Sequence, residues 1–131
     1  MRILYYPGDN EASQNSLHKY ITNELRKLNP KQWRQMDFFL YETQQGSEED
    51  LVEKIREEEK KPWDKRKIAH LKEGLYEYRG GQSRLGTIRV YFTYNKETVF
   101  VVDAENKTSD HNKIERARAR LREIFTSNKE Q

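Results

Sequence analysis

Three arginines surround one predicted β-hairpin in the second half of the chain. The segment 71–92 reads LKEGLYEYRGGQSRLGTIRVYF and carries Arg79, Arg84 and Arg89. Arginine is a poor filler for a small sheet, because its guanidinium group keeps its charge and needs hydrogen-bond partners. The planar guanidinium fork binds phosphate oxygens through two parallel hydrogen bonds. The hairpin is therefore predicted to bind a negatively charged ligand.

Strand alternation predicts which side chains share a face with these arginines, because successive side chains point to opposite faces of a sheet. The face toward the helices is expected to hold Tyr76, Tyr78, Ile88, Val90, Phe92 and Tyr94. The open face is expected to hold Glu77, Arg79, Arg89 and Tyr91. Such a face suits a polyanion with bases, on which Tyr91 could stack. The alternative is an ordinary cross-strand ion pair between Glu77 and Arg79 or Arg89.

The elements that must position these residues are expected in the order β-α-α-(α)-β-β-β-α. Strands are predicted at 2–6, 75–79, 87–94 and 98–104, and helices at 16–28, 47–60 and 111–126. One more helix precedes Gly46 and carries an apolar face of Trp33, Met36, Phe39 and Leu40. The last three strands form an antiparallel meander with helices over one face. The fold class is therefore α+β, with two layers.

The composition predicts one domain over residues 1–131. Apolar residues make up 34% of the chain and charged residues 36%, while eight Tyr, five Phe and two Trp supply bulky core material. The chain has no cysteine, which excludes disulfides and thiolate sites. It also lacks a membrane-length apolar run and a signal-peptide pattern, so we expect a cytoplasmic protein. Residues 47–62 are expected to hold a peripheral acidic helix, and residues 127–131 a flexible tail.

Charge is divided unevenly along the chain. Residues 1–60 hold 9 Lys and Arg against 12 Asp and Glu, a balance of −3, whereas residues 61–131 hold 16 against 10, a balance of +6. Such asymmetry is typical of a protein with one basic and one more acidic partner surface. The alternative is an ordinary solvated charged surface.

Several segments of the second half resemble the RelE/HigB toxin superfamily, and in particular its phage-related, HigB-like branch. The resemblance rests on GLYEYR at 74–79, RVYF at 89–92, VFVVD at 99–103, the Lys107-Thr108 pair and the basic segment at 113–122. It covers roughly residues 65–125. It implies a RelE-like domain, to which the acidic helix is an addition.

The resemblance implies a type II toxin, silenced by a cognate antitoxin that is expected to be of helix-turn-helix type. Its activity would be ribosome-dependent cleavage of mRNA, in which the RNA 2′-hydroxyl attacks the adjacent phosphate. This reaction is expected to need no metal and no cofactor. The alternatives are a ParE-like gyrase inhibitor, a noncatalytic RNA-binding protein and a module that binds only a protein partner.

Site residues follow from matched positions. The resemblance assigns catalysis to Arg79, Arg89, Lys107 and His111. Candidate RNA-binding residues are Lys65, Lys67, Lys72, Arg84, Tyr91, Lys113 and Arg116. The alternatives are a solvated His111 at a helix start and a solvated basic face on the last helix. Glu77 and Glu105 argue against a catalytic role, because their negative charge would neutralise Arg79 and Lys107.

Overall fold

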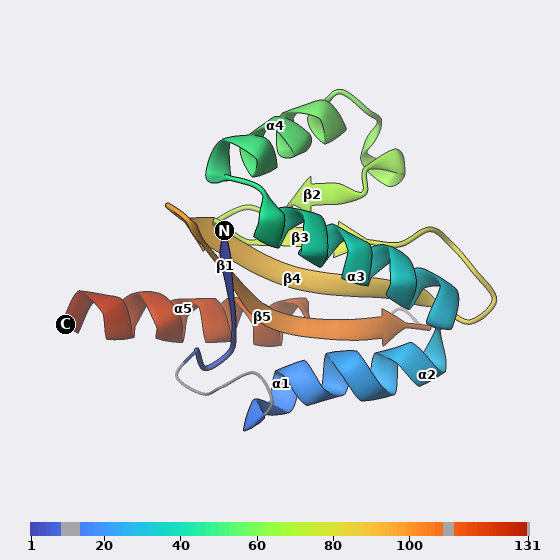
Figure 1. Cartoon of the computed structure of the whole chain (residues 1–131), viewed down its shortest axis with the longest axis horizontal. Helices are drawn as coiled ribbons and strands as arrows, with labels where there is room; N and C mark the ends of the chain where they lie inside the picture. The colour runs from blue at the N-terminus through green and yellow to red at the C-terminus, as the bar shows by residue number, and fades with distance from the viewer. Residues whose placement is uncertain (9–13, 109–111, 131) are drawn as a thin grey trace.

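A mixed five-stranded sheet forms the centre of the computed structural model, which describes residues 1–8, 14–108 and 112–130, with side chains described as far as residue 126. The strand order across the sheet is β1-β5-β4-β3-β2 (Figure 1). The strands are β1 (Arg2–Tyr5), β2 (Ile68–His70), β3 (Tyr76–Arg79), β4 (Thr87–Asn95) and β5 (Thr98–Lys107). Strands β3, β4 and β5 form the expected antiparallel meander, and β1 lies parallel to β5.

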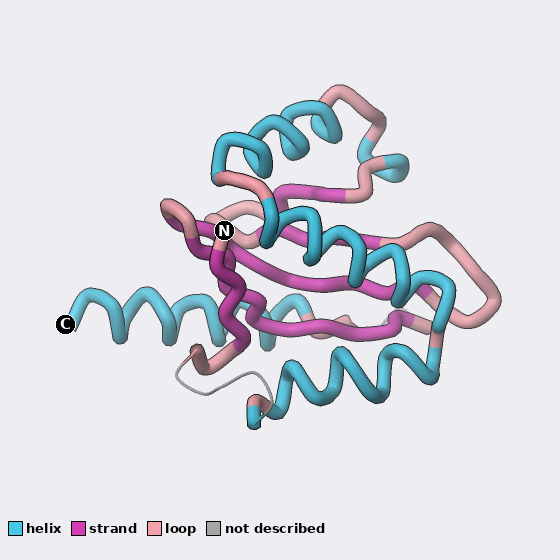
Figure 2. Tube along the Cα trace, in the orientation of Figure 1, coloured by secondary structure: helices cyan, strands magenta, loops and turns pink. Residues whose placement is uncertain are grey.

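Helices precede and follow this meander (Figure 2). One helical segment comprises α1 (Ser16–Lys19), a π-helical stretch (Tyr20–Leu25) and α2 (Arg26–Leu28). The next helices are α3 (Pro30–Gln45), α4 (Glu48–Glu59) and a short 3₁₀ turn (Trp63–Lys65). The last helix, α5 (Ile114–Glu130), starts later than expected and extends into the segment expected as a tail. Within the described residues, no helix is both long and apolar enough to cross a membrane.

Strand β2 is the element that the sequence did not predict. No strand is expected here from the sequence, because only Ile68, Ala69, His70 and Leu71 separate Lys67 from Lys72. Ile68 and Ala69 are nevertheless buried, and Ile68 lies opposite Tyr78 in an antiparallel pair with β3. A strand this short shows no alternation of its own, so its neighbours decide its structure.

The larger core lies between the sheet and the helices α1 to α4. The sheet contributes Tyr78, Ile88, Val90 and Phe92, which alternation predicted for the face that meets the helices, together with Ile68, Val99, Val101 and Ala104. The helices contribute Leu17, Ile21, Leu25, Met36, Phe39, Leu40, Leu51 and Ile55. Met36, Phe39 and Leu40 belong to the apolar face expected for the helix that precedes Gly46, and Trp33 of that face is partly buried.

A smaller core lies on the opposite face of the sheet, beneath α5. It contains Leu75, Tyr91, Val102, Ala117, Leu121 and Ile124. The α+β class is confirmed, and α5 adds one helix on the face that was expected to be open. The face is therefore open only beyond the start of α5, at the end of the sheet where β3 and β5 finish and β4 begins.

The acidic helix α4 covers the β2 edge of the sheet, as Figure 1 shows. Ser47 and Asp50 form a capping box, in which the Ser47 side chain accepts from the Asp50 N–H and the Asp50 carboxylate accepts from the Ser47 N–H. The helix buries only Leu51 and Ile55. This agrees with the predicted peripheral helix, and it shields an edge strand from pairing with other chains.

Two leucines one turn apart give a matched test of this packing. Leu25 is fully buried, whereas Leu28 is 50% exposed. Leu25→Ala is expected to lower the free energy of unfolding by about 2–5 kcal/mol, because it leaves a cavity in the larger core. Leu28→Ala should change it by no more than about 0.5 kcal/mol. Urea denaturation of both variants measures the difference, and equal losses would contradict the described core.

Candidate functional site

Four charged residues meet at the open end of the sheet. Arg79 of β3 lies directly opposite Arg89 of β4, and Glu77 precedes Arg79 by two residues on the same face. Lys107 of β5 lies opposite Thr87, and alternation places it on this face too. The charges of Arg89, Arg79 and Lys107 all act on the Glu77 carboxylate. We call Glu77, Arg79, Arg89 and Lys107 the arginine cluster.

Glu77 and Arg89 form a buried ion pair at the centre of this cluster. Arg89 Nη1 donates to Glu77 Oε1 over 2.6 Å, and the Glu77 side chain is 1% exposed. Burial raises the pKa of the Glu77 carboxyl, although the charges of Arg89 and Arg79 and the Arg89 hydrogen bond lower it. Arg89 Nε is buried without a hydrogen-bond partner among the described residues. Of the two ion pairs considered for this face, Glu77 with Arg79 or with Arg89, the structure contains the pair between Glu77 and Arg89.

Arg79 is fixed by the chain segment between α4 and β2. Its Nε donates to the Arg66 carbonyl over 2.7 Å, and its Nη2 donates to the Trp63 carbonyl. Its guanidinium carbon lies 4.9 Å from the centroid of the Trp63 ring. Burial lowers the pKa of Arg79, while the Glu77 charge raises it. The guanidinium is therefore held in one orientation beside Arg89, and part of it stays exposed.

Two like charges directly opposite each other across a ladder destabilise a sheet. Arg79 and Arg89 occupy such a pair, and the fold compensates with the Glu77 carboxylate and two backbone carbonyls. Arrangements that cost stability are concentrated at functional sites. The paired arginines therefore single out this end of the sheet as the candidate site.

The loop that carries Arg84 joins the cluster at its rim. Two buried side chains of the helical layer hold this loop: the Gln32 Oε1 accepts from the Ile88 N–H over 2.8 Å, and Asn29 Nδ2 donates to the Gly86 carbonyl over 3.0 Å. Arg84 and Lys107 line a shallow hollow of about 270 Å³. Arg84 is exposed and therefore extends the basic surface of the cluster.

Tyr91 is not accessible to a base, which corrects the expected stacking role. It lies in the smaller core and is fully buried beneath α5. Its hydroxyl donates to Glu105 Oε2 over 2.6 Å, and burial together with this hydrogen bond raises the pKa of Tyr91. Glu105 Oε2 also accepts from the Lys113 N–H over 2.8 Å. Glu105 thus joins the residue before α5 to the sheet, and in the ladder it lies directly opposite Arg89.

Two arginines of α5 neutralise a buried carboxylate. Asp103 is fully buried and accepts from Arg116 Nε over 2.6 Å and from Arg116 Nη2 over 2.8 Å. Arg120 lies 3.5 Å from the same carboxylate. Lys113 Nζ donates to the Ala104 carbonyl over 3.2 Å and lies 4.6 Å from the centroid of the Tyr20 ring. Lys113 and Arg116, both expected to bind RNA, are therefore engaged within the protein.

The other candidate lysines are not gathered at the cluster. Lys65 is exposed and lies in the 3₁₀ turn, between Trp63 and Arg66, whose carbonyls accept from Arg79. Lys67 lines a groove between α3 and α4. Lys72 lies in the turn between β2 and β3, at the opposite end of β3 from Arg79. His111 lies outside the described residues.

Glu77 is the functional candidate that sequence reasoning missed, because it was interpreted only as a residue that neutralises Arg79. A carboxylate beside fixed guanidinium groups can serve as a general base, and burial raises the pKa of Glu77 in the direction that favours this role. Alternation already placed Glu77 beside the arginines, but it did not predict that the side chain is buried and paired with Arg89. A base beside fixed guanidinium groups is suited to phosphodiester transesterification.

Within the described residues, no group of three or more His, Asp or Glu side chains could hold a metal ion. Comparison of the chain with protein-family models, with curated proteins and with solved structures gives no match. The function must therefore be argued from the arginine cluster itself.

The pKa of Glu77 tests the electrostatics of the cluster. Carboxyl ¹³C NMR titration is expected to give a pKa above 4.5, because burial outweighs the attraction of the arginines. Arg89→Met should raise this pKa further, since Arg89 is the largest opposing influence. Stability that Glu77 contributes is then lost as pH rises through its folded pKa. A wild-type value at or below 4.5 would contradict the described burial.

Proposed function

We propose that the chain is the toxin of a type II toxin-antitoxin system, a ribosome-dependent mRNA endonuclease of RelE/HigB type. The observation that carries the proposal is the Arg79–Arg89 pair held opposite each other around Glu77. The resemblance at 74–79 and 89–92 supports it, since both arginines fall within those segments. Its partners are then mRNA on the ribosome and a cognate antitoxin, and its place of action is the cytoplasm.

The proposed reaction begins when RNA places a phosphate between the two arginines. Phosphate oxygens compete with Glu77 for Arg89, since guanidinium binds phosphate bidentately. Glu77 then loses its largest stabilising charge, and its pKa rises. A phosphate that binds Arg89 thus makes the carboxylate a stronger base at the moment when a base is needed.

Glu77 is 1% exposed while it is paired with Arg89, so the proposal requires that Arg89 uncovers the carboxylate when it turns to the phosphate. In the next step, Glu77 accepts the proton of the RNA 2′-hydroxyl. The 2′-oxygen forms a bond to phosphorus, and the bond between phosphorus and the 5′-oxygen breaks. Arg79 and Arg89 stabilise the additional negative charge on the phosphate oxygens in the transition state. The departing 5′-oxygen takes a proton, for which Lys107 is a candidate donor on this face. The products are a 2′,3′-cyclic phosphate and a 5′-hydroxyl.

The hydrogen bonds that Arg79 and Arg89 already make favour a second, noncatalytic function. Arg79 is already bound to two backbone carbonyls, and Arg89 to Glu77. These bonds favour a noncatalytic relative with the same fold, such as a ParE-like gyrase inhibitor or a module that binds RNA or protein. The two functions differ in whether Glu77 takes part in chemistry.

Variants of the cluster separate the two functions. Arg79→Ala is expected to lower the rate of ribosome-dependent cleavage about 10²–10³-fold, because it removes a fixed charge from the transition state. Glu77→Gln should lower it about 10²–10⁴-fold, because it removes the base. Arg34→Ala, an exposed arginine of α3, is the matched control and should cleave as the wild type does. Urea denaturation confirms that each variant is folded. If folded Glu77→Gln cleaves normally, Glu77 is not the base.

RNA binding is expected to depend strongly on salt. We expect Arg79, Arg84 and Lys107 to contact phosphates. In a plot of log affinity for RNA against log salt concentration, each such contact should contribute a slope of about −0.7. Arg84→Ala should reduce the slope by about one such contact without abolishing cleavage. Fluorescence anisotropy with a single-stranded RNA between low and moderate salt measures the slope. A flat dependence would indicate a partner that is not a nucleic acid.

A further inference from the structure

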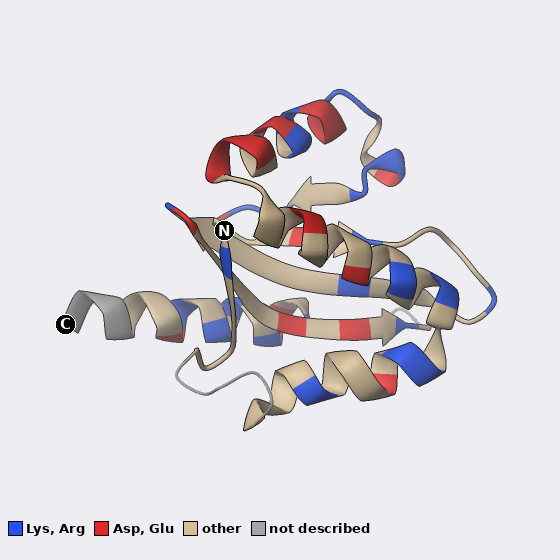
Figure 3. Cartoon of the chain, viewed as in Figure 1, with Lys and Arg blue, Asp and Glu red and all other residues tan. Residues whose placement is uncertain are grey.

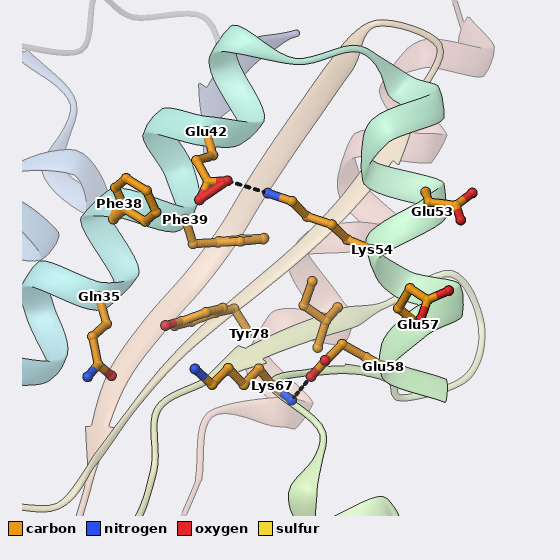
Figure 4. A pocket seen from close by; sticks show the side chains of 11 residues that line it. Gln35, Phe38, Phe39, Glu42, Glu53, Lys54, Glu57, Glu58, Lys67 and Tyr78 are labelled. Atoms are coloured by element: carbon orange, nitrogen blue, oxygen red, sulfur yellow. Dashed lines mark hydrogen bonds and ion pairs between the residues drawn. The ribbon is translucent and has the colours of Figure 1, made fainter. Parts of the chain in front are cut away.

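An apolar groove lies between α3 and α4, apart from the arginine cluster. It has a volume of about 450 Å³ and is bounded by residues of α3, α4, β2 and β3 (Figure 4). Tyr78 and Arg79 are neighbours in β3, so their side chains point to opposite faces of the sheet. The groove therefore opens on the face of the sheet that packs against α3 and α4. A molecule bound in the groove leaves the arginine cluster uncovered.

The floor of the groove is aromatic and aliphatic. Phe39 stacks on Tyr78 with 4.7 Å between ring centroids, and Ile68 of β2 lies beside them. Phe38 stands at the margin and is 60% exposed. Tyr41, one helical turn along α3 from Phe38, is 58% exposed. Residues three apart are neighbours on a helix surface, so the apolar surface continues beyond the groove along α3.

The rim of the groove is acidic. It carries Glu42, Glu53, Glu57 and Glu58 against Lys54 and Lys67, a balance of −2. Lys54 is engaged with Glu42 at 3.1 Å, across the groove from α4 to α3. Glu58 accepts from the Lys67 N–H and the Lys61 ammonium. Glu53 and Glu57 are exposed, and Figure 3 shows that acidic residues dominate α4.

We propose that this groove binds a basic amphipathic helix of a partner protein, with aliphatic or aromatic anchors flanked by Lys or Arg. The aromatic floor would bury the anchors, and Glu53 and Glu57 would attract the flanking cations. A helix explains the exposure of both Phe38 and Tyr41, since it can cover the groove and its continuation along α3. A small molecule held in the groove would leave Tyr41 uncovered. The proposal does not depend on RNA cleavage.

The test is selection from a phage-displayed library of helical peptides of about 15 residues, the length at which isolated helices become stable. The expected binders carry Leu or Phe at helical spacing together with Lys or Arg, and their NMR footprint covers Phe38, Phe39 and Tyr78. Phe38→Ala should weaken a selected peptide at least about tenfold. Leu28→Ala, also at an exposed apolar residue, should not weaken it.

Charge reversal gives a second, independent comparison. Glu53→Lys/Glu57→Lys should weaken the selected peptide at least about tenfold. Glu49→Lys/Glu59→Lys changes the charge of α4 equally, at exposed positions outside the groove, and should bind nearly as the wild type does. Because all four positions are exposed, both variants should fold, which urea denaturation checks.

Several results would overturn the proposal. They are a selection that yields no binder, binders that are acidic, or a footprint outside the groove. Self-association in sedimentation experiments that Phe38→Ala abolishes would instead assign the groove to a second copy of the chain. Loss of RNA cleavage in the cluster variants, with peptide binding intact, leaves this proposal standing, so the two proposals fail separately.

Discussion

Burial of carboxylates on the face of the sheet beneath α5 is the constraint on which this structure depends. Glu77, Asp103 and Glu105 are all buried there, and an unpaired buried charge costs far more than an exposed one. Arg89 neutralises Glu77, Arg116 and Arg120 neutralise Asp103, and the Tyr91 hydroxyl and the Lys113 N–H satisfy Glu105. The position of α5 and the orientation of Arg89 both follow from these pairs.

The same constraint decides which cations can act on a ligand. Arg116 and Arg120 of α5 are paired with the buried Asp103, so part of the positive charge of residues 61–131 is neutralised within the protein. At the open end of the sheet, by contrast, Arg79, Arg89 and Lys107 surround Glu77, and the second carboxylate there, Glu105 opposite Arg89, is bonded to the Tyr91 hydroxyl and the Lys113 N–H. This local excess supports anion binding there, while the acidic rim of α4 presents the opposite charge on the other face.

The sequence predicted those features that depend on local periodicity. The meander, the helix that precedes Gly46 and the shared face of Arg79 and Arg89 all follow from spacing along one or two segments. It failed where distant segments decide the outcome. Ile68–His70 becomes a strand only because β3 pairs with it, and Tyr91, expected on an open face, is buried because α5 covers it.

The most direct test of the central claim, that Glu77 and the paired arginines promote attack by the RNA 2′-hydroxyl, is chemical analysis of RNA ends after incubation of ribosome-bound mRNA with the protein. The account predicts 2′,3′-cyclic phosphate and 5′-hydroxyl ends, and no cut at a position where the 2′-hydroxyl is replaced by hydrogen. Ends that carry a 3′-hydroxyl and a 5′-phosphate, or cleavage next to a 2′-deoxy position, would contradict it.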